Sequence, residues 1–455
     1  MREIKFLIYD LVFLFGFIIY LPVYFWRKKI TFLSLKERLG CISWFSPNRS
    51  IWLQVVSVGE VNLIENLLTK IKDEYGCPIV ISTTTLTGNL MARRKYSKLA
   101  KIIFFPLDIS FVLRKAIKVI NPRVFIGLET EIWPNLFYQL KRKNIPIVII
   151  NGRISDSAYQ RYRWTNQALK STINRCLYIG VQNEMYKKRF ISLGADAEKL
   201  IISGNLKFES ILPAKEKMLK IQKKYSSLFN LPLVETSLST QLNISQQQEF
   251  VTTEVKNFNK NDKLILIAAS THHPEEEIII NIYKDLLKEF NNLKLVIAPR
   301  HLQRIESVMK VIALAEFKPI KISEATGDST PENSVFVVDT LGELLSLFGV
   351  ADICFVGGSL SPCGGHNILE PVYFSKPTLF GPYMNNFLDI KKIVLEKKAG
   401  IQVNNPAELK DSILRLLDDR KLRKSLAEGC VKVFQKEKKC LSKNLQLIRN
   451  SMGHS

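Results

Sequence analysis

The chain has 455 residues, which is too many for one hydrophobic core and favours two domains with an additional segment. Its 65 Lys and Arg residues against 42 Asp and Glu residues give a net charge of +23, and 46% of the residues are hydrophobic, as in folded proteins. This balance indicates an anionic partner, either a membrane or a phosphorylated substrate, although a lysine-rich surface without a specific partner is an alternative. No RNA-binding signature, zinc-finger spacing or basic helix-turn-helix pattern occurs, so we expect no nucleic-acid partner.

The N-terminal segment Ile4–Trp26 is apolar and long enough to cross a hydrocarbon core, which takes about 20 residues. Basic residues at 27–29 favour a cytoplasmic location for the rest of the chain, and no small-residue cleavage site follows. Asp10 and Pro22 disfavour a simple span. We therefore predict a membrane anchor over residues 1–30, with two alternatives: a helix that dips into one leaflet, or an apolar helix buried in the protein.

The cysteines give no sign of a disulfide framework or a zinc site. There are seven, an odd number, and no two have CxxC spacing. This pattern favours free thiols in a reducing compartment. We therefore expect no metal site in this chain.

Residues 31–211 alternate short apolar runs with amphipathic stretches, which is typical of a parallel sheet with helices on both faces. Polar side chains that act on a ligand should then lie in the loops that follow the strands. The predicted strands are Ile51–Val56, Pro78–Thr83, Ile102–Phe105, Val124–Leu128, Ile145–Ile150 and Leu177–Val181.

Carboxylates follow two of these strands. Glu60 lies at a strand end and helix start, where it could act as a general base or only complement the helix dipole. Glu129 and Glu131 follow another strand, with Trp133 beside them, and capping of the next helix is the alternative.

Cations follow two further strands. Arg153, with Arg161 and Arg163 beyond it, could bind a phosphate group or could be solvated surface. Lys207 follows the last strand and could neutralise a phosphate or a developing negative charge, although an isolated lysine is more often a surface residue.

The segment 212–262 is rich in charged, Ser and Gln residues and is predicted to be a linker or insertion, disordered in part. The sheet pattern resumes over residues 263–430, and residues 431–455 form a lysine-rich helical tail. The strands predicted in this second domain are Leu264–Ala268, Leu293–Ala298, Phe336–Val338, Asp352–Val356 and Thr378–Phe380.

The stretch 351–382 reads as strand, glycine loop, helix and strand. Glycine pairs at 357–358 and 364–365 would let backbone N–H groups approach a ligand closely, and a helix predicted from about His366 would favour an anion at its start. Glu370, on the first turn, could accept hydrogen bonds from ribose hydroxyls. Purely structural turns are the alternative. We expect a donor nucleotide in this domain, an acceptor in the first domain and a cleft between them.

Eight motifs support a resemblance that runs from the N-terminal segment to the C-terminal tail. They are SVGE at 57–60, ETEIWPN at 129–135, NGRIS at 151–155, GNLKF at 204–208, STH at 270–272, PRH at 299–301, DTLGEL at 339–344 and GGHNILEP at 364–371. With these motifs the sequence resembles the 3-deoxy-D-manno-octulosonic acid (Kdo) transferases of lipid A assembly, which are glycosyltransferases of the GT-B fold.

The resemblance implies two Rossmann-like doubly wound parallel-sheet domains that face each other across a cleft, plus an N-terminal membrane helix. It implies transfer of Kdo from CMP-Kdo to the bisphosphorylated lipid A precursor lipid IV(A), with inversion at the anomeric centre and without a metal or other cofactor. It places the protein on the cytoplasmic face of the bacterial inner membrane, an anionic surface.

The resemblance also assigns roles to residues. Glu60 matches the general base, and Glu131 and Lys207 match residues that stabilise the transition state. The positions that match CMP-binding residues are Pro299, Arg300, Leu341, Gly342, Glu343, Asn367, Ile368, Leu369 and Glu370.

The sequence departs from the family pattern in two places. Gln54 stands where the family often has His, and the segment 212–262 is longer than expected. Two other functions remain open: a GT-B transferase that uses a UDP-sugar and an envelope lipid, and a non-catalytic membrane-associated binding protein. Glu60 and the two nucleotide loops argue against the second.

Overall fold

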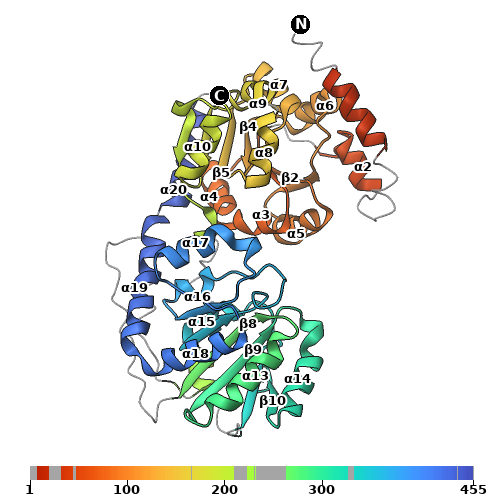
Figure 1. The fold of residues 1–455 in the computed structure, drawn as a ribbon. Coiled ribbons are helices and arrows are strands. Elements are labelled where there is room, and N and C mark those ends of the chain that lie inside the picture. Colours follow the sequence, from red (N-terminus) through yellow and green to blue (C-terminus); the bar gives the residue numbers. More distant parts are fainter. Residues whose placement is uncertain are drawn as a thin grey trace. The chain divides into compact units, whose positions relative to one another are not determined.

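The computed structural model describes residues 8–19, 32–44, 48–164, 166–209, 223–229, 231, 263–325, 331, 333–437 and 439–453. The chain forms two compact units (Figure 1). Unit 1 comprises Met1–Ser210 with Lys439–Ser455, and unit 2 comprises Ile211–Lys438. Each unit is built on a seven-stranded parallel sheet, which confirms the predicted pair of parallel-sheet α/β domains.

The sheet of unit 1 has the strand order β3-β2-β1-β4-β5-β6-β7. Its strands are β1 (Ser50–Val55), β2 (Ile79–Thr83), β3 (Lys101–Phe104), β4 (Pro122–Leu128), β5 (Ile147–Gly152), β6 (Tyr178–Val181) and β7 (Leu200–Ile202). From β1 the chain adds β2 and β3 on one side, and it then adds β4 to β7 on the other side of β1. The gap between β1 and β4 is therefore the topological switch point, where the loops at the carboxyl ends of the strands diverge and leave room for a ligand.

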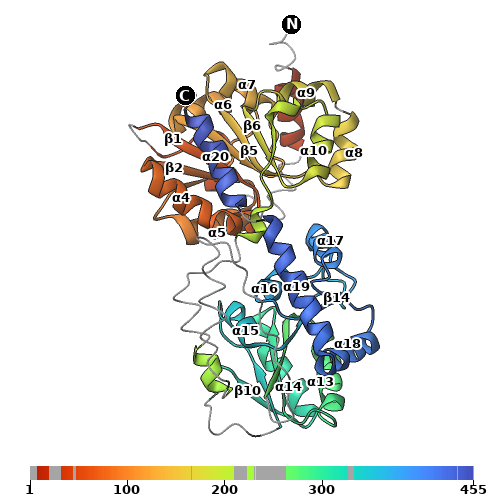
Figure 2. The same cartoon turned by 90° about the vertical axis from the view of Figure 1, so that its left-hand side faces the viewer.

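Helices cover both faces of this sheet. They are α2 (Phe32–Arg38), α3 (Val58–Leu63), α4 (Glu65–Tyr75), α5 (Leu86–Tyr96), α6 (Ser110–Ile120), α7 (Pro134–Arg142), α8 (Asp156–Trp164), α9 (Asn166–Ile173), α10 (Glu184–Ser192) and α20 (Cys440–Met452). The C-terminal helix α20 packs on β4, β5 and β6 (Figure 2). The predicted tail 431–455 is thus divided, because its first part belongs to a helix of unit 2.

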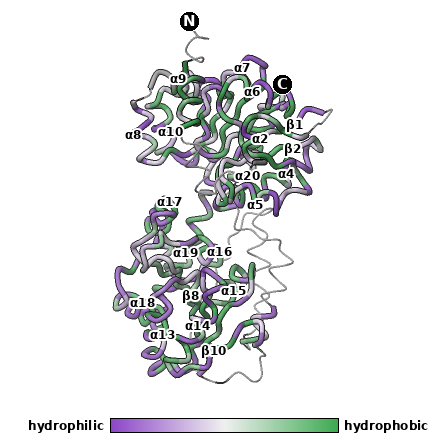
Figure 3. The backbone as a smooth tube through the Cα atoms, turned by 90° about the vertical axis from the view of Figure 1, so that its right-hand side faces the viewer, coloured by the Kyte–Doolittle hydropathy of each residue, from purple (hydrophilic) through white to green (hydrophobic). Residues whose placement is uncertain are grey.

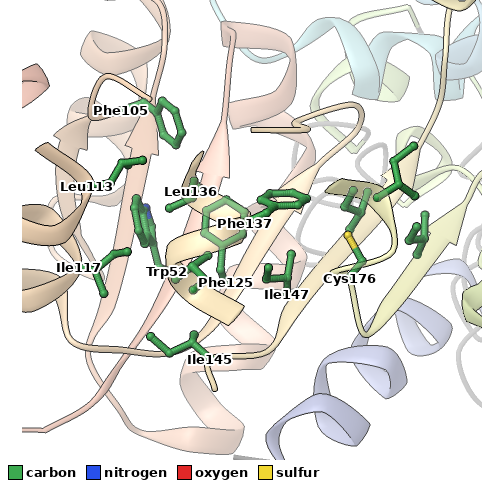
Figure 4. Close-up of a cluster of buried hydrophobic side chains, with 14 of the residues drawn as sticks. Trp52, Phe105, Leu113, Ile117, Phe125, Leu136, Phe137, Ile145, Ile147 and Cys176 are labelled. Atoms are coloured by element: carbon green, nitrogen blue, oxygen red, sulfur yellow. The ribbon is translucent and has the colours of Figure 1, made fainter. Parts of the chain in front are cut away.

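One face of the sheet packs against α6, α7, α9 and α10 through a cluster rich in aromatic residues (Figure 4). Trp52 is fully buried and meets Phe125 edge-on, with ring centroids 5.1 Å apart. The opposite face packs against α3, α4, α5 and α20. Because both faces are covered, the strands are continuous apolar runs, and Figure 3 shows hydrophobic stretches of the chain inside each unit.

Residues 8–19 are helical, and this helix lies against unit 1. The Asp10 carboxylate accepts hydrogen bonds from the Ser110 backbone N–H (3.0 Å) and the Asn135 amide (2.6 Å), and the Tyr9 hydroxyl donates to Asp108 (3.1 Å). Asp10 thus attaches the helix to the domain. None of the helices in the described part of the chain is long and apolar enough to cross a membrane. The remainder of the predicted anchor Ile4–Trp26 lies outside the described residues.

The sheet of unit 2 has the strand order β10-β11-β9-β8-β12-β13-β14, and its switch point lies between β8 and β12. The strands are β8 (Leu264–Thr271), β9 (Leu293–Pro299), β10 (Lys318–Lys321), β11 (Ser334–Val337), β12 (Ile353–Val356), β13 (Thr378–Phe380) and β14 (Ile401–Gln402). The helices are α13 (Glu275–Leu286), α14 (Ile305–Leu314), α15 (Leu344–Val350), α16 (Leu369–Tyr373), α17 (Leu388–Glu396), α18 (Pro406–Asp418) and α19 (Arg420–Glu437).

Part of the segment that we predicted as a linker packs on unit 2. Tyr225 is fully buried, and Phe229 meets Phe336 edge-on with ring centroids 5.1 Å apart. Tyr225, Leu228 and Phe229 are therefore buried, and the rest of 223–229 includes exposed residues. Most of the rest of 212–262 lies outside the described residues.

Candidate active site

Glu60 lies on the first turn of α3, directly after β1 and at the switch point of unit 1. Its side chain is nearly buried, with 8% of the residue exposed. The carboxylate accepts a hydrogen bond from the Val56 backbone N–H (2.8 Å) and one from the Ser57 hydroxyl (3.4 Å). These two bonds fix the carboxylate at the strand end, as a general base requires.

The surroundings of Glu60 raise its pKa from an ordinary value of 4.5 to about 8. Burial is the largest cause, and the negative charge of Glu129 is the next; Glu131 adds to it, while the hydrogen bonds from Val56 and Ser57 oppose it. A carboxylate with a raised pKa binds a proton more strongly than an ordinary one. Glu60 is therefore suited to accept a proton from a hydroxyl group.

Glu131 is buried and held by two donors. The Gln54 amide (3.0 Å) and the Trp133 indole N–H (2.9 Å) both donate to the same carboxylate oxygen. Burial raises the pKa of Glu131, and these two hydrogen bonds counter the rise. Sequence reasoning left Gln54 without a role, but the structure makes it a direct partner of a predicted catalytic residue. Its place on β1, beside β4, is the reason.

Glu129 ties the loop after β4 to the loop after β5. Its carboxylate forms an ion pair with Arg153 (2.7 Å), and the Thr130 hydroxyl donates to the Arg153 carbonyl. Arg161 and Arg163 are exposed on α8, a helix with no buried residue. Of the three arginines predicted as a phosphate cluster, Arg153 is thus engaged with Glu129, whereas the other two project from the surface.

Lys207 lies in a short 3₁₀ helix, η2 (Leu206–Phe208), at the carboxyl end of β7. The Asn151 side chain accepts a hydrogen bond from the Leu206 N–H (3.0 Å), which ties this turn to the end of β5. Leu206 belongs to the same buried cluster as Val61 of α3. The turn that carries Lys207 is thus packed on the side of the sheet where Glu60 lies.

In unit 2 the structure brings three predicted donor-site residues together. The Asn367 amide donates to the Glu370 carboxylate (3.1 Å), and Arg300, at the end of β9, is close enough to affect the same carboxylate. Burial raises the pKa of Glu370 to about 7, while the Asn367 hydrogen bond and the Arg300 charge oppose the rise. Helix α16 begins at Leu369, slightly later than predicted, so Glu370 lies on its first turn.

The other predicted nucleotide positions differ in exposure. Ile368 and Leu369 are fully buried, so neither side chain is open to a ligand. Leu341 is 78% exposed, and Gly342 adopts a positive φ of 83° beside it. Glu343 accepts hydrogen bonds from the Thr340 hydroxyl (2.7 Å) and from the Tyr225 hydroxyl.

The loop after β12 differs from its predicted use. Its backbone N–H groups at 358–361 donate to the carboxylate of Glu275, at 2.7 to 3.4 Å, and the His272 N–H donates to it as well (2.9 Å). A Cβ atom at Gly357 would lie 2.6 Å from a Glu275 oxygen, so glycine is required there for close approach to a side chain. These N–H groups bind a protein carboxylate and are not directed at a ligand.

The described part of the chain contains no group of three or more His, Cys, Asp or Glu side chains that could hold a metal ion. Cys354 and Cys430 are fully buried, and burial raises the pKa of each thiol above its usual range. The described cysteines are all free.

Two parallel-sheet α/β units, each with polar loops at its switch point, define a protein of the GT-B fold class. A solved glycosyltransferase from Rickettsia africae has this fold: it covers 90% of this chain and 100% of its own length, with a TM-score of 0.52 and 15% identity. At that identity the likeness concerns the fold alone.

The family follows from closer relatives. A model of the 3-deoxy-D-manno-octulosonic-acid transferase (kdotransferase) family matches residues 33–210. A 3-deoxy-D-manno-octulosonic acid transferase from Haemophilus influenzae is 32% identical over 420 residues, which cover 91% of this chain and 90% of that protein. The chain belongs to the Kdo transferase family, as the motifs indicated.

A longer relative also matches. A bifunctional glycosyltransferase/methyltransferase from Fusobacterium nucleatum is 35% identical over 392 residues, covering 86% of this chain. The match covers 56% of that relative's length.

Proposed function

We propose that this protein, as a Kdo transferase of lipopolysaccharide synthesis, transfers Kdo from CMP-Kdo to lipid IV(A) and releases CMP. The donor half of the reaction belongs to unit 2 in this proposal, and the acceptor half to unit 1. The family membership supports the class of reaction. The substrates and the roles of individual residues are our inference from the two groups of side chains described above.

The reaction needs a base but no covalent nucleophile. The acceptor hydroxyl oxygen attacks the anomeric carbon of Kdo, the bond from that carbon to the phosphate oxygen breaks, and CMP leaves with the bonding electrons. The hydroxyl proton passes to the Glu60 carboxylate, and the attack from the opposite side inverts the anomeric centre. Glu131 and Lys207 are proposed to stabilise the transition state.

The observation that carries this proposal is the raised pKa of Glu60 in a buried group of three carboxylates. Like charges and burial are the means by which proteins tune a carboxylate toward neutral pH, and such residues are concentrated at functional sites. A carboxylate that only capped α3 would not need two further carboxylates nearby.

For the donor, we propose that Arg300, Asn367 and Glu370 bind CMP together with the loop 341–343. Arg300 supplies a positive charge for the phosphate, and the Glu370 carboxylate can accept hydrogen bonds from ribose hydroxyls. The exposed Arg161 and Arg163 of α8 are our candidates for the acceptor phosphates.

Incubation of the purified protein with CMP-Kdo and lipid IV(A), with the lipid products resolved by mass, tests the function directly. We expect a mass increase of the lipid by whole Kdo units and an equal release of CMP. The control replaces CMP-Kdo by UDP-sugars, which should give no product. Transfer from a UDP-sugar, or no transfer from CMP-Kdo, would contradict the proposal.

We also propose that the protein works at the cytoplasmic face of the inner membrane. The helix at residues 8–19 supports this, because one side of it packs on unit 1 while large apolar side chains on the rest are more than half exposed. Those exposed residues are Ile8, Leu11, Val12, Phe15, Ile18 and Ile19. The net charge of +23 suits an anionic lipid surface.

Fractionation separates insertion from electrostatic adhesion, because high salt screens charges over a Debye length but does not release an inserted apolar helix. We expect the full-length protein to resist salt and to require detergent, and the double variant Val12→Glu, Phe15→Glu to be released by salt. The control is Leu314→Glu, at a residue 85% exposed on α14 of unit 2. Release of the unmodified protein by salt alone would contradict an inserted helix.

A further inference from the structure

Three histidines converge at the carboxyl edge of the unit 2 sheet, and no role has been given to any of them above. His272 follows β8, His301 follows β9 and His366 belongs to the loop after β12. Because β9, β8 and β12 are neighbours in that order, the three side chains lie at and beside the switch point. Only five histidines occur in the whole sequence, so their concentration here calls for a chemical explanation.

His272 and His366 are hydrogen-bonded to each other. Their Nε2 atoms are 2.9 Å apart, and the two rings are nearly parallel, with 6° between their planes. Such a bond needs one N–H group and one lone pair, so the two rings cannot both be imidazolium ions. The pair therefore holds at most one positive charge.

The protein fixes the pair from both sides. On one side the Glu275 carboxylate accepts the His272 backbone N–H and the N–H groups of the loop after β12. On the other, Gly358 lies against His366, and a Cβ atom at Gly358 would come within 2.8 Å of the imidazole ring. The arrangement of the two rings is thus built into the fold and not left to surface side chains.

Burial, together with the charged groups around the pair, favours its neutral state when no ligand is bound. Burial lowers the pKa of His366 to about 4, and the Arg300 charge adds to the effect. Burial also lowers the pKa of His272, against an opposing effect of Glu275. The titratable and charged groups that face the pair are Glu275, Glu276, Arg300, His301 and Arg304.

These neighbours do not contribute equally. Arg304 is paired with the buried Glu276 carboxylate through two contacts, at 2.7 and 3.1 Å. Glu275 is surrounded by backbone N–H groups. Arg300 has an exposed side chain, and its charge acts on His366 and on Glu370. An anion that binds Arg300 would offset the part of the pKa lowering of His366 that comes from the Arg300 charge, and its own negative charge would favour an imidazolium.

We infer that His272 and His366 form a proton-sharing pair that binds the anionic group of the donor and takes up a proton as the anion binds. The proton goes to Nδ1 of the donating ring, the one ring nitrogen that can accept it without breaking the bond between the rings. The resulting imidazolium then pairs with the anion. This inference rests on the proposed function, because it assumes that a nucleotide phosphate binds in unit 2.

Calorimetry with the full-length protein tests this uptake. The probe is cytidine 5′-methyl phosphate, a phosphodiester whose single charge does not titrate near neutral pH. Titrations at one pH in imidazole and in Tris buffers, which differ in ionisation enthalpy and contain no phosphate to compete with the probe, give the number of protons taken up. We expect uptake by the unmodified protein and weaker binding as pH rises, with a limit of about tenfold per pH unit for one proton.

His366→Gln and His272→Gln should each abolish the uptake and weaken binding about tenfold, because a single ring can no longer share the proton. His273→Gln is the matched control: this neighbour is exposed, pairs with Glu277 and should leave the uptake unchanged. Thermal unfolding of each variant shows whether it is folded. If one of the two pair variants does not fold, the other still tests the proton uptake.

Each outcome decides the question. Binding of the probe without proton uptake, or uptake that persists in both pair variants, overturns the inference while the proposed function stands. If cytidine probes fail to bind but the uridine ester binds, the donor assignment fails, and the same measurement with the uridine ester decides the role of the histidines. If no nucleotide ester binds, both proposals are overturned.

Discussion

Each unit has a seven-stranded parallel sheet with a switch point beside its first strand, but the two units differ in the side chains that they place there. In each, a glutamate lies on the first turn of the helix after the first strand of the unit: Glu60 after β1 and Glu275 after β8. Glu60 accepts one backbone N–H and lies near two further carboxylates, whereas Glu275 accepts five backbone N–H groups. Glutamates at equivalent positions thus have different roles, because the surrounding loops determine whether a carboxylate is reactive or structural.

The contrast extends to charge. Around Glu60 the neighbours are Glu129 and Glu131, which suit the removal of a proton from a hydroxyl group. Beside Glu275 lie His272 and, hydrogen-bonded to it, His366, and the charges of Arg300 and Arg304 act on this pair, which suits an anion. We therefore propose that the two units provide a basic carboxylate in one case and an anion site in the other.

The largest effect that we predict is on turnover in unit 1. Glu60→Gln should lower the rate of Kdo transfer by about 100-fold or more, because the acceptor hydroxyl loses its base, while the affinity for CMP stays unchanged. Steady-state transfer and calorimetric CMP binding measure the two. The control is Glu65→Gln, at an exposed residue of α4 that pairs with Lys95. Near-normal turnover in Glu60→Gln would refute the base assignment.

A Glu→Gln substitution at the first turn of the helix should change the free energy of unfolding in opposite directions in the two units. Glu275→Gln should lower the free energy of unfolding by about 3 kcal/mol, because the amide cannot accept five N–H groups as the buried carboxylate does. Urea denaturation of each variant measures this change. A Glu275→Gln protein as stable as the parent would contradict the structural role.

Glu60→Gln should instead stabilise unit 1 at alkaline pH. The folded-state pKa of Glu60 is about 8, above its ordinary value of 4.5, so the folded state binds a proton more tightly than the unfolded state in that range. The stability contributed by this proton is present below about 4.5 and is lost as pH rises through about 8. The glutamine variant avoids this loss, and denaturation at acidic and alkaline pH should show the difference.

A smaller effect is expected at the donor site of unit 2. Glu370→Ala should weaken CMP binding about tenfold, since one charged hydrogen-bond acceptor is removed, and should leave acceptor affinity unchanged. Calorimetry measures the donor dissociation constant. Glu396→Ala, at an exposed residue of α17, is the control. An unchanged dissociation constant in Glu370→Ala would exclude contact between this carboxylate and the nucleotide.

The smallest effect that we predict follows from the loss of a hydrogen bond to Glu131. Gln54→Leu removes a donor to that carboxylate and should lower turnover several-fold, by about 1 kcal/mol, with CMP affinity unchanged. Gln54→His, which restores the residue that the family often carries, should retain most of the activity because a ring N–H can donate in the same place. Equal losses in the two variants would indicate that the shape of the side chain matters and its hydrogen bond does not.

The sequence predicted the buried strands well, because a sheet covered on both faces leaves continuous apolar runs. The predicted strand Thr378–Phe380 is β13 as found. The strands without a predicted range lie at sheet edges: β7 has only three residues, β10 is KPIK, with no fully buried residue, and β14 has only two residues. An edge strand forms by pairing with its neighbour, and its own residues give little periodic signal.

The placement of Glu60 and Arg300 at strand ends was predictable, because each follows a buried apolar run. The supporting contacts were not, because they join distant parts of the chain. Gln54 meets Glu131 across 77 residues, and His272 meets His366 across 94. Only the order of the strands in each sheet brings these partners together.

The pH dependence of transfer tests the central claim, that unit 1 supplies a carboxylate tuned to act as a base, most directly. The quantity to measure is kcat/KM for the lipid acceptor at saturating CMP-Kdo, which reports the ionisation of the donor-bound enzyme. We predict that it rises with pH to a midpoint near 8, the pKa given to Glu60 by burial and by Glu129. A profile that is already flat from weakly acidic pH upward would contradict the account.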